Sequence, residues 1–173
     1  MAEAKLTTVW TGGRRKLGKD PIFGAWVKHI GTIRLPVSDV TPFYYLVRAI
    51  CYQQLAGKAA QTIHGRVVEA LKGDVSPEKA LRVRETTLRG AGLSGNKYAA
   101  IRDLATKIRS GEVEVHDLDE QPDEEIIRRL VTVRGIGVWT AQMYLMFRLH
   151  RPDVWPIGDL GVRAGYAKVH GLD

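Results

Sequence analysis

Apolar side chains recur at helical spacing along most of this chain. The clearest stripes lie in residues 43–55, with Phe43, Leu46, Val47, Ile50 and Cys51, and in residues 97–108, with Tyr98, Ile101, Leu104, Ala105 and Ile108. With the Gly and Pro breaks between segments, the pattern predicts helices over residues 22–29, 43–55, 58–71, 84–90, 97–108, 122–129, 139–147 and 160–169, and a short one starting at Ser76-Pro77. No segment alternates apolar and polar residues for long, and residues 33–37 read as an extended linker. The predicted fold class is all-α.

Composition limits what such a helical protein could be. The chain has 173 residues, of which 45% are hydrophobic, enough for one domain or two small interleaved lobes with a real core. The formal net charge of +7 is compatible with an anionic partner, although many basic proteins bind no nucleic acid.

Cysteine and histidine usage argues against several cofactors. Cys51 is the single cysteine, so neither an internal disulfide nor a four-cysteine iron–sulfur cluster can form. The five histidines show no metal-ligand spacing with one another or with Cys51, so no zinc site is expected. The N-terminus lacks an apolar signal region and no apolar run approaches 18 residues, which predicts a soluble intracellular protein without a membrane partner.

The first 19 residues are basic around Gly12-Gly13. We expect a flexible leader over residues 1–19, followed by one domain over residues 20–173. The alternative is that the leader is an arm that contacts phosphates.

The most informative stretch is residues 130–141. A helix with acidic residues in its first turn and arginines in its last precedes Gly135-Ile136-Gly137, and an apolar, buried helix follows. Glycine tolerates the positive φ angles of a tight turn. The second helix would direct its first N–H groups toward an anion such as phosphate, although an ordinary αα-hairpin turn fits the same residues.

A second motif, Trp155-Pro156-Ile157-Gly158-Asp159, follows the hairpin. Together the two motifs resemble the helix-hairpin-helix (HhH-GPD) DNA glycosylase superfamily, in particular its alkylation-repair branch, 3-methyladenine DNA glycosylase II. The resemblance extends from about Asp20 to the end of the chain. It implies two α-helical lobes with a DNA-binding cleft between them, in which the first and last parts of the chain share one lobe.

The resemblance assigns chemistry to Asp159, where the family carries its catalytic aspartate. A glycosylase breaks the bond between a base and C1′ of its sugar, and a fixed carboxylate stabilises the oxocarbenium-like sugar that develops. The implied reaction is the excision of alkylated purines from duplex DNA, which leaves an abasic site. Asp159 also has the position of a helix N-cap, and a cap alone is the alternative.

Trp139 occupies the position where the bifunctional branch carries its Schiff-base lysine. Because an indole cannot form that covalent intermediate, the implied enzyme is monofunctional and uses water as nucleophile. The indole could also form a wall of the base pocket by stacking on an electron-poor alkylated ring. A core tryptophan is the alternative.

Cys51-Tyr52-Gln53-Gln54-Leu55 resembles the family's Ser-Gln-Gln-Leu stretch. The match places Gln53 near the target base, and Gln54 or Leu55 in the gap left by the flipped nucleotide. A solvated helix end is the alternative for the glutamines. Three further pocket-wall candidates, for which core packing is the alternative, are Tyr44, Tyr45 and Met143.

The hairpin's implied role is to hold one DNA phosphate through the N–H groups of Gly135, Gly137 and Trp139. Arg134, Arg163 and Lys168 are further phosphate candidates, for which plain surface charge is the alternative. In the family, carbonyls of the hairpin hold a monovalent cation, and the matching carbonyls here are those of Val131, Val133 and Ile136. We expect no other cofactor.

Two hypotheses of different classes follow. The first is a monomeric, monofunctional DNA glycosylase for damaged double-stranded DNA, in the cytoplasm or nucleoid. The second is a non-catalytic helix-hairpin-helix module that binds duplex or damaged DNA. The sequence stops at Gly171-Leu172-Asp173, where relatives continue through further helices, so weak or absent catalysis is also an expectation to test.

Overall fold

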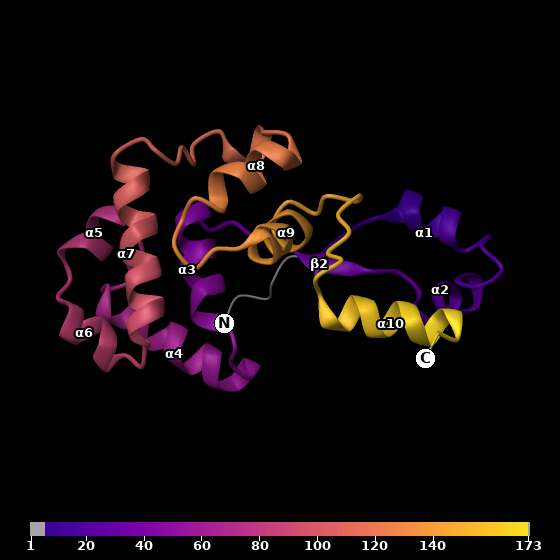
Figure 1. Cartoon of the computed structure of the whole chain (residues 1–173), viewed down its shortest axis with the longest axis horizontal. Coiled ribbons are helices and arrows are strands. Elements are labelled where there is room, and N and C mark those ends of the chain that lie inside the picture. The colour runs from indigo at the N-terminus through magenta and orange to yellow at the C-terminus, as the bar shows by residue number, and fades with distance from the viewer. Residues whose placement is uncertain (1–5, 173) are drawn as a thin grey trace. The chain divides into compact units, whose positions relative to one another are not determined.

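A computed structural model of the chain describes residues 6–172 (Figure 1). Contacts divide the chain into two compact units. The central unit is Val40–Ala141, and the terminal unit joins residues up to Asp39 to residues from Gln142 onward.

The central unit is helical. Its elements are α3 (Pro42–Tyr52), α4 (Gly57–Ala70), α5 (Pro77–Arg82), α6 (Glu85–Gly90), α7 (Gly95–Arg109), the short 3₁₀ helix η1 (Leu118–Glu120), α8 (Asp123–Leu130) and the start of α9 (Val138–Phe147). The long helix α7 packs against α3, α5 and α6 (Figure 1). The central unit is therefore built around α7, and the all-α prediction holds for its described elements.

The core of the central unit follows the predicted apolar stripes. All five stripe residues of α3 are buried, and so are Ile101, Leu104 and Ala105 of α7. Tyr98 and Ile108 are half-buried instead, because they lie toward the two ends of that helix.

Side-chain caps set where several of these helices begin. Thr41, Ser76 and Ser94 each accept a hydrogen bond from the backbone N–H three residues later, at 3.2–3.3 Å. Such caps satisfy N–H groups that have no partner within the helix.

The terminal unit contains β1 (Leu6–Thr8), α1 (Thr11–Leu17), α2 (Gly24–Ile30), β2 (Arg34–Pro36) and α10 (Leu160–His170), together with the end of α9. The two strands are antiparallel, with Leu6 opposite Pro36 and Thr8 opposite Arg34. No residue of α1, α2 or α10 is fully buried. This unit thus has a much smaller core than the central unit.

The terminal unit contains regular elements that the sequence patterns did not predict. Residues 6–17, expected in a flexible leader, form β1 and α1, and the expected linker at 33–37 contains β2. Strands of three residues are too short for alternation to be visible in a sequence. Residues 6–8 are held instead by pairing with residues about 30 positions later.

Polar contacts join the early and late parts of the terminal unit. The indole N–H of Trp10 donates to the carbonyl of His150 at 3.0 Å. Arg148 donates to the Tyr144 hydroxyl at 2.9 Å and to Ser38 Oγ at 3.2 Å. Residues more than 100 positions apart therefore share one unit.

None of the described helices combines the length and the apolar character needed to span a membrane.

One buried histidine makes the central unit sensitive to pH. His64 of α4 is only 8% exposed and contacts the rings of Tyr44 and Tyr52 edge-on. Burial, together with the nearby charge of Arg48, lowers the pKa of His64 below 6.5. Because the unfolded chain then takes up the proton more readily than the folded one, protonation favours unfolding.

We therefore expect the free energy of unfolding to fall as the pH decreases through about 6.5, the value for His in an unfolded chain. The variant His64→Phe keeps an aromatic ring and lacks the titrating group, so its unfolding temperature should fall less between pH 7 and pH 5. Thermal unfolding of both proteins across this range measures the difference. Parallel curves would contradict the assignment to His64.

Candidate functional site

The predicted helix–turn–helix is present at residues 123–147. Helix α8 ends at Leu130, and Val133 N–H donates to the Leu130 carbonyl at 3.1 Å. Ile136 N–H then donates to the Val133 carbonyl at 3.0 Å, and α9 begins at Val138. The first N–H groups of an α-helix have no acceptor within it, so this turn places a helix N-terminus next to two glycines.

The two hairpin glycines have different constraints. Gly135 has a φ of +75°, and a Cβ atom built on it would lie 3.2 Å from the Cβ of Ala100 in α7. Gly137 has neither a positive φ nor any atom within 4 Å of such a Cβ. Gly135 is therefore required by the fold, whereas the fold alone would allow a side chain at Gly137.

The two arginines at the end of α8 are held in ion pairs with acidic side chains. Arg128 and Arg129 hydrogen-bond the carboxylate of Glu125, and these bonds lower the pKa of Glu125 to about 2. Arg129 also pairs with Asp117 at 3.0 Å. Arg134, on the turn itself, is exposed. Arg134 is thus better placed than the α8 arginines to meet an anion.

The outer surface of the hairpin is unusually apolar for exposed positions. Val138 and Trp139, at the start of α9, are 53% and 45% exposed. Trp139 is therefore not the core tryptophan that was the alternative interpretation. The indole at this position therefore lies partly on the protein surface.

The segment expected to fill the DNA gap lies in a turn. Helix α3 ends at Tyr52, three residues earlier than predicted, because Gln53 leaves the helical region with a ψ of 132°, and Gln54 then adopts a left-handed conformation with φ of +55°. Leu55, directly after it, is 40% exposed. The predicted helix end is thus a projecting turn over residues 53–55, hereafter the Gln53–Leu55 turn.

Gln53 connects this turn to the hairpin. Its Nε2 donates to the carbonyl of Gly135 at 2.9 Å and lies 3.4 Å from Thr140 Oγ1 at the start of α9. The amide thus bridges two segments about 80 residues apart in sequence. The predicted contact of Gln53 with a target base stays a prediction.

The remaining pocket-wall candidates are partly buried. Tyr44, Tyr45 and Met143 are all intermediate in exposure, and Tyr44 packs its ring 5.3 Å from that of His64. Cys51 is fully buried, which raises the pKa of its thiol to about 11. Cys51 therefore stays a protonated core residue at neutral pH.

Asp159 belongs to the terminal unit and caps α10. Its Oδ1 accepts a hydrogen bond from the Val162 N–H at 2.9 Å, as predicted for an N-cap. The carboxylate lies at the positive end of the helix dipole, which favours a negative charge there. A Cβ on Gly161 would lie 3.1 Å from Asp159 Oδ1. Sequence reasoning missed this glycine, although it follows Asp159 by only two residues.

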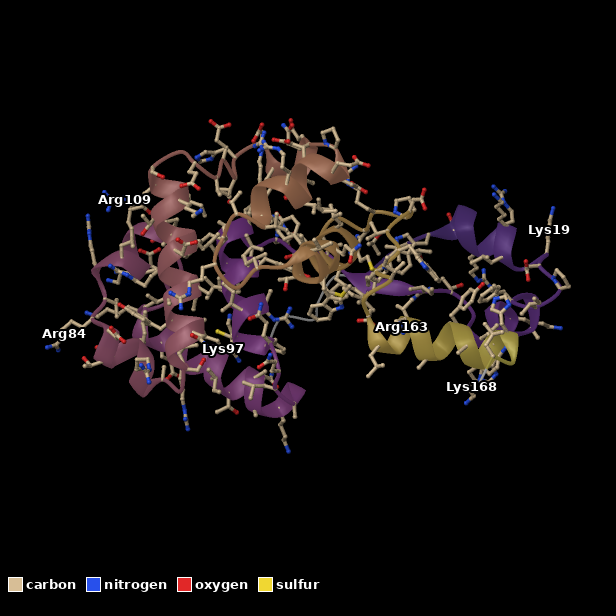
Figure 2. All side chains as sticks on the ribbon, in the orientation of Figure 1. Lys19, Arg84, Lys97, Arg109, Arg163 and Lys168 are labelled. Carbon is tan, nitrogen blue, oxygen red and sulfur yellow. The ribbon has the colours of Figure 1, made fainter. Side chains whose placement is uncertain are left out.

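The surface beside Asp159 is aromatic and basic. Trp155 and Tyr166 meet edge-on with ring centroids 6.2 Å apart, and with Arg163 they line a cavity of about 240 Å³. Figure 2 shows Arg163 near the start of α10 and Lys168 near its end, and both are exposed. Sequence reasoning selected the two cations and gave the aromatic rings no role, although Trp155 begins the motif that ends at Asp159 and Tyr166 follows it.

The candidate residues therefore fall into two groups. The central unit contains the hairpin, the Gln53–Leu55 turn, Tyr44, Tyr45 and Trp139. The terminal unit contains Met143, Asp159, Arg163 and Lys168. Among the described residues, no cluster of three or more His, Cys, Asp or Glu side chains could hold a metal ion.

Comparison with known families gives these motifs a common context. Residues 47–173 match the family described as HhH-GPD superfamily base excision DNA repair protein. This match covers most of the chain, including the Gln53–Leu55 turn, the hairpin and Asp159. The protein therefore belongs to the HhH-GPD superfamily.

Two similar proteins have related names. A protein of Schizosaccharomyces pombe named DNA-3-methyladenine glycosylase 1 is 33% identical over 160 residues, which are 90% of this chain and 70% of that protein. A protein of Bacillus subtilis named putative DNA-3-methyladenine glycosylase YfjP is 30% identical over 162 residues. That match covers 90% of this chain and spans 56% of the Bacillus protein's length.

Solved structures agree with the fold. A DNA-3-methyladenine glycosidase from Bacillus halodurans superposes with a TM-score of 0.83 at 32% identity, covering 96% of this chain and 77% of that one. The S. pombe 3-methyladenine DNA glycosylase Mag1, solved in complex with abasic DNA, also gives a TM-score of 0.83 at 32% identity. It covers 94% of this chain and 82% of the Mag1 chain.

The different constraints on the hairpin glycines lead to a prediction. Gly135→Ala forces a left-handed alanine close to Ala100 and should lower the free energy of unfolding by at least about 1–2 kcal/mol. Gly137→Ala, the matched control, should change it by no more than about 0.5 kcal/mol. Denaturant unfolding of both variants measures this contrast. Equal effects would mean that the close approach of Gly135 to α7 does not constrain the hairpin.

Proposed function

We propose that this protein is a monofunctional DNA glycosylase that flips alkylated purines of the 3-methyladenine type out of duplex DNA and hydrolyses their N-glycosidic bond. The observation that carries the proposal is the combination of a glycine hairpin with an aspartate-capped helix in a member of the HhH-GPD superfamily. The names of its S. pombe and Bacillus relatives support the substrate class.

Asp159 is the proposed catalytic residue. As the glycosidic bond opens, the sugar gains positive charge, and a carboxylate fixed beside it stabilises that charge. The cap hydrogen bond to Val162 holds the carboxylate in one orientation before the substrate arrives. The same carboxylate can orient or deprotonate the attacking water. A purine alkylated at N3 is already cationic, so it leaves with little need for a general acid.

Trp139 supports a hydrolytic route. An indole has no amine that could attack C1′ and form a Schiff base, so water is the proposed nucleophile and the DNA backbone stays intact. Its exposed ring can stack on an electron-poor alkylated base and form one wall of the pocket. Tyr44, Tyr45, Met143 and Gln53 are the proposed neighbours of that base.

The Gln53–Leu55 turn is proposed to occupy the gap in the duplex. Extruding a nucleotide costs a few kcal/mol of stacking and pairing, and a side chain inserted into the gap offsets part of that cost. Gln54 and Leu55 project from a turn that the Gln53 amide fixes to the hairpin. A turn held in this way can insert without first being ordered.

The hairpin is proposed to bind one phosphate through the N–H groups of Gly135, Gly137 and Trp139, with Arg134 adding its charge. The terminal unit carries eleven basic and six acidic side chains, a formal charge of +5, whereas the central unit carries fifteen and thirteen. Arg163 and Lys168 are therefore proposed as phosphate contacts from the more basic unit. This distribution also favours phosphate contacts by the ordered basic helix α1.

A monovalent cation fits the donor chemistry of the hairpin. Among the described residues, the carbonyls of Val131 and Ile136 accept no backbone N–H, and that of Val133 accepts one, from Ile136. Carbonyl oxygens are suitable ligands for a hard cation, and these three would hold it. A bound cation would add positive charge where the phosphate lies.

The proposed partner is double-stranded DNA bound by a monomer in the cytoplasm or nucleoid.

The role of Asp159 can be separated from its role as a cap. Because Asn caps a helix about as well as Asp, Asp159→Asn should change the free energy of unfolding by no more than about 1 kcal/mol. Loss of the charge should slow single-turnover release of methylated base by at least about a hundredfold. Affinity for the same duplex should stay within a few-fold or rise slightly.

Asp153→Asn is the matched control, since it removes the same charge from an exposed residue of the same unit. The control should excise like the parent protein. Equal excision by Asp159→Asn and the parent would leave Asp159 as a helix cap only. If the parent protein binds damaged duplex and releases no base, the non-catalytic DNA-binding module becomes the better interpretation.

Phosphate binding by Arg134 predicts a particular salt dependence. Each phosphate contact contributes about 0.9 to the slope of log affinity against log salt concentration for duplex DNA. Arg134→Ala should reduce the magnitude of that slope by about this amount. Arg84→Ala removes the same charge from an exposed residue directly before α6 (Figure 2) and should leave the slope unchanged. Equal slopes for the two variants would remove Arg134 from the interface.

A further inference from the structure

Polar side chains of α7 hold the backbone of both segments that the proposed function places against DNA. These side chains are Lys97, Asp103 and Lys107. With Ala100, which Gly135 approaches, they follow the three- and four-residue spacing of one helix face. Each of the three charged side chains bonds a backbone group outside α7. None of these residues belongs to the hairpin motif or to the Asp159 motif.

Asp103 and Lys107 bond the hairpin at two points. The backbone N–H of Arg134 donates to Asp103 Oδ2 at 2.7 Å, and Lys107 Nζ donates to the carbonyl of Thr132 at 2.8 Å. The carboxylate of Asp103 thus accepts from an N–H of the hairpin, and the ammonium of Lys107 donates to a carbonyl two residues earlier on it. Ala100, between them and Lys97, is the residue that Gly135 approaches closely.

Neighbouring charges keep Lys107 in its donating form. Its ammonium also bonds Glu112 Oε1 at 2.7 Å. The hydrogen bond to Glu112, with the negative charges of Glu112 and Asp103, raises the pKa of Lys107. The contact to Thr132 is therefore made by a charged donor throughout the physiological pH range.

Lys97 makes the equivalent contact to α3. Its Nζ donates to the carbonyl of Cys51 at 2.8 Å. Cys51 lies in the last turn of helix α3, directly before the Gln53–Leu55 turn. A cation at the C-terminal end of a helix interacts favourably with the helix dipole. Lys97 lies near the opposite end of α7 from Arg109 (Figure 2). One rigid helix therefore holds the end of α3 and the hairpin at two places along its length.

Asp103 is electrostatically unexpected at this position. A carboxylate beside a hairpin that binds phosphate repels that phosphate, so charge alone would favour its removal. Its contribution must then come from the bond that it accepts from Arg134. That bond fixes the Val133–Arg134 peptide, one residue before Gly135, whose carbonyl receives the Gln53 amide.

We propose that α7 sets the position of the hairpin relative to the Gln53–Leu55 turn, with Asp103 and Lys107 as positioning residues of the hairpin and Lys97 as the positioning residue of the turn. The proposal rests on the proposed function, because it assigns these residues to DNA binding through segments that they hold. None of the three is proposed to touch DNA.

The test compares Asp103→Ala with Asp103→Asn. Alanine removes both the charge and the acceptor, whereas asparagine removes only the charge and can still accept from Arg134 N–H. Affinity for an abasic-site duplex should weaken about two- to tenfold in Asp103→Ala, the range of one lost hydrogen bond. Asp103→Asn should bind as well as the parent or more tightly. Tighter binding by both variants would mean that Asp103 acts only as a repelling charge.

Amide hydrogen exchange supplies a readout that does not depend on activity. Exchange of the Arg134 amide should accelerate in Asp103→Ala and stay near the parent rate in Asp103→Asn. Glu69→Ala, on the exposed face of α4, removes the same charge and should alter neither exchange at Arg134 nor affinity. Unchanged exchange and affinity in Asp103→Ala would overturn the proposal.

Lys107→Met keeps the test decisive if Asp103→Ala does not fold. It removes the donor to Thr132, and it should weaken affinity more than Lys58→Met, which removes an exposed charge from α4. Equal losses in the two lysine variants would reduce Lys107 to general charge. If the parent protein itself does not bind the duplex, the proposed function fails, whereas a binding parent with unaffected variants defeats only the positioning role.

Discussion

The contact between Gly135 and Ala100 is the constraint on which the rest of the candidate site depends. A left-handed residue without a side chain allows the hairpin to approach α7, and this approach places the Gly135 carbonyl where the Gln53 amide reaches it. The same approach brings Thr132 and Arg134 within reach of Lys107 and Asp103. Any residue with a Cβ at position 135 would disturb the hairpin and the Gln53–Leu55 turn together.

In the proposed function, this arrangement gives the hairpin and the Gln53–Leu55 turn different tasks at low cost in ordering. The hairpin is proposed to hold a phosphate through backbone N–H groups without regard to sequence, and the turn to supply side chains for the gap. Because both segments are bonded to neighbours within the central unit, little conformational entropy would remain to be lost on binding. The proposal leaves recognition of an alkylated base to the ring of Trp139 and its neighbours, and the chemistry to Asp159.

Sequence patterns predicted the helices well because periodicity and capping are local properties. The buried stripe of α3 and the cap at Asp159 could be named residue by residue. Tertiary features could not be predicted in this way: the pairing of β1 with β2, and the bond that the Arg134 N–H donates to Asp103, join residues whose proximity no local pattern encodes. The turn at Gln53 and Gln54 was also missed, because neither residue is a usual helix breaker. The roles of Trp139 and Asp159 came from resemblance, since an indole and an N-cap alone indicate no reaction.

In the proposed reaction, water and not an amine of the protein releases an alkylated base from duplex DNA. The most direct measurement incubates the protein with a methylated duplex, with and without borohydride, and follows free base, strand integrity and covalent adduct together. The account predicts free methylated purine, a strand that breaks only after alkali, and no trapped adduct. A robust borohydride-trapped adduct, or bound duplex from which no base is released, would contradict it.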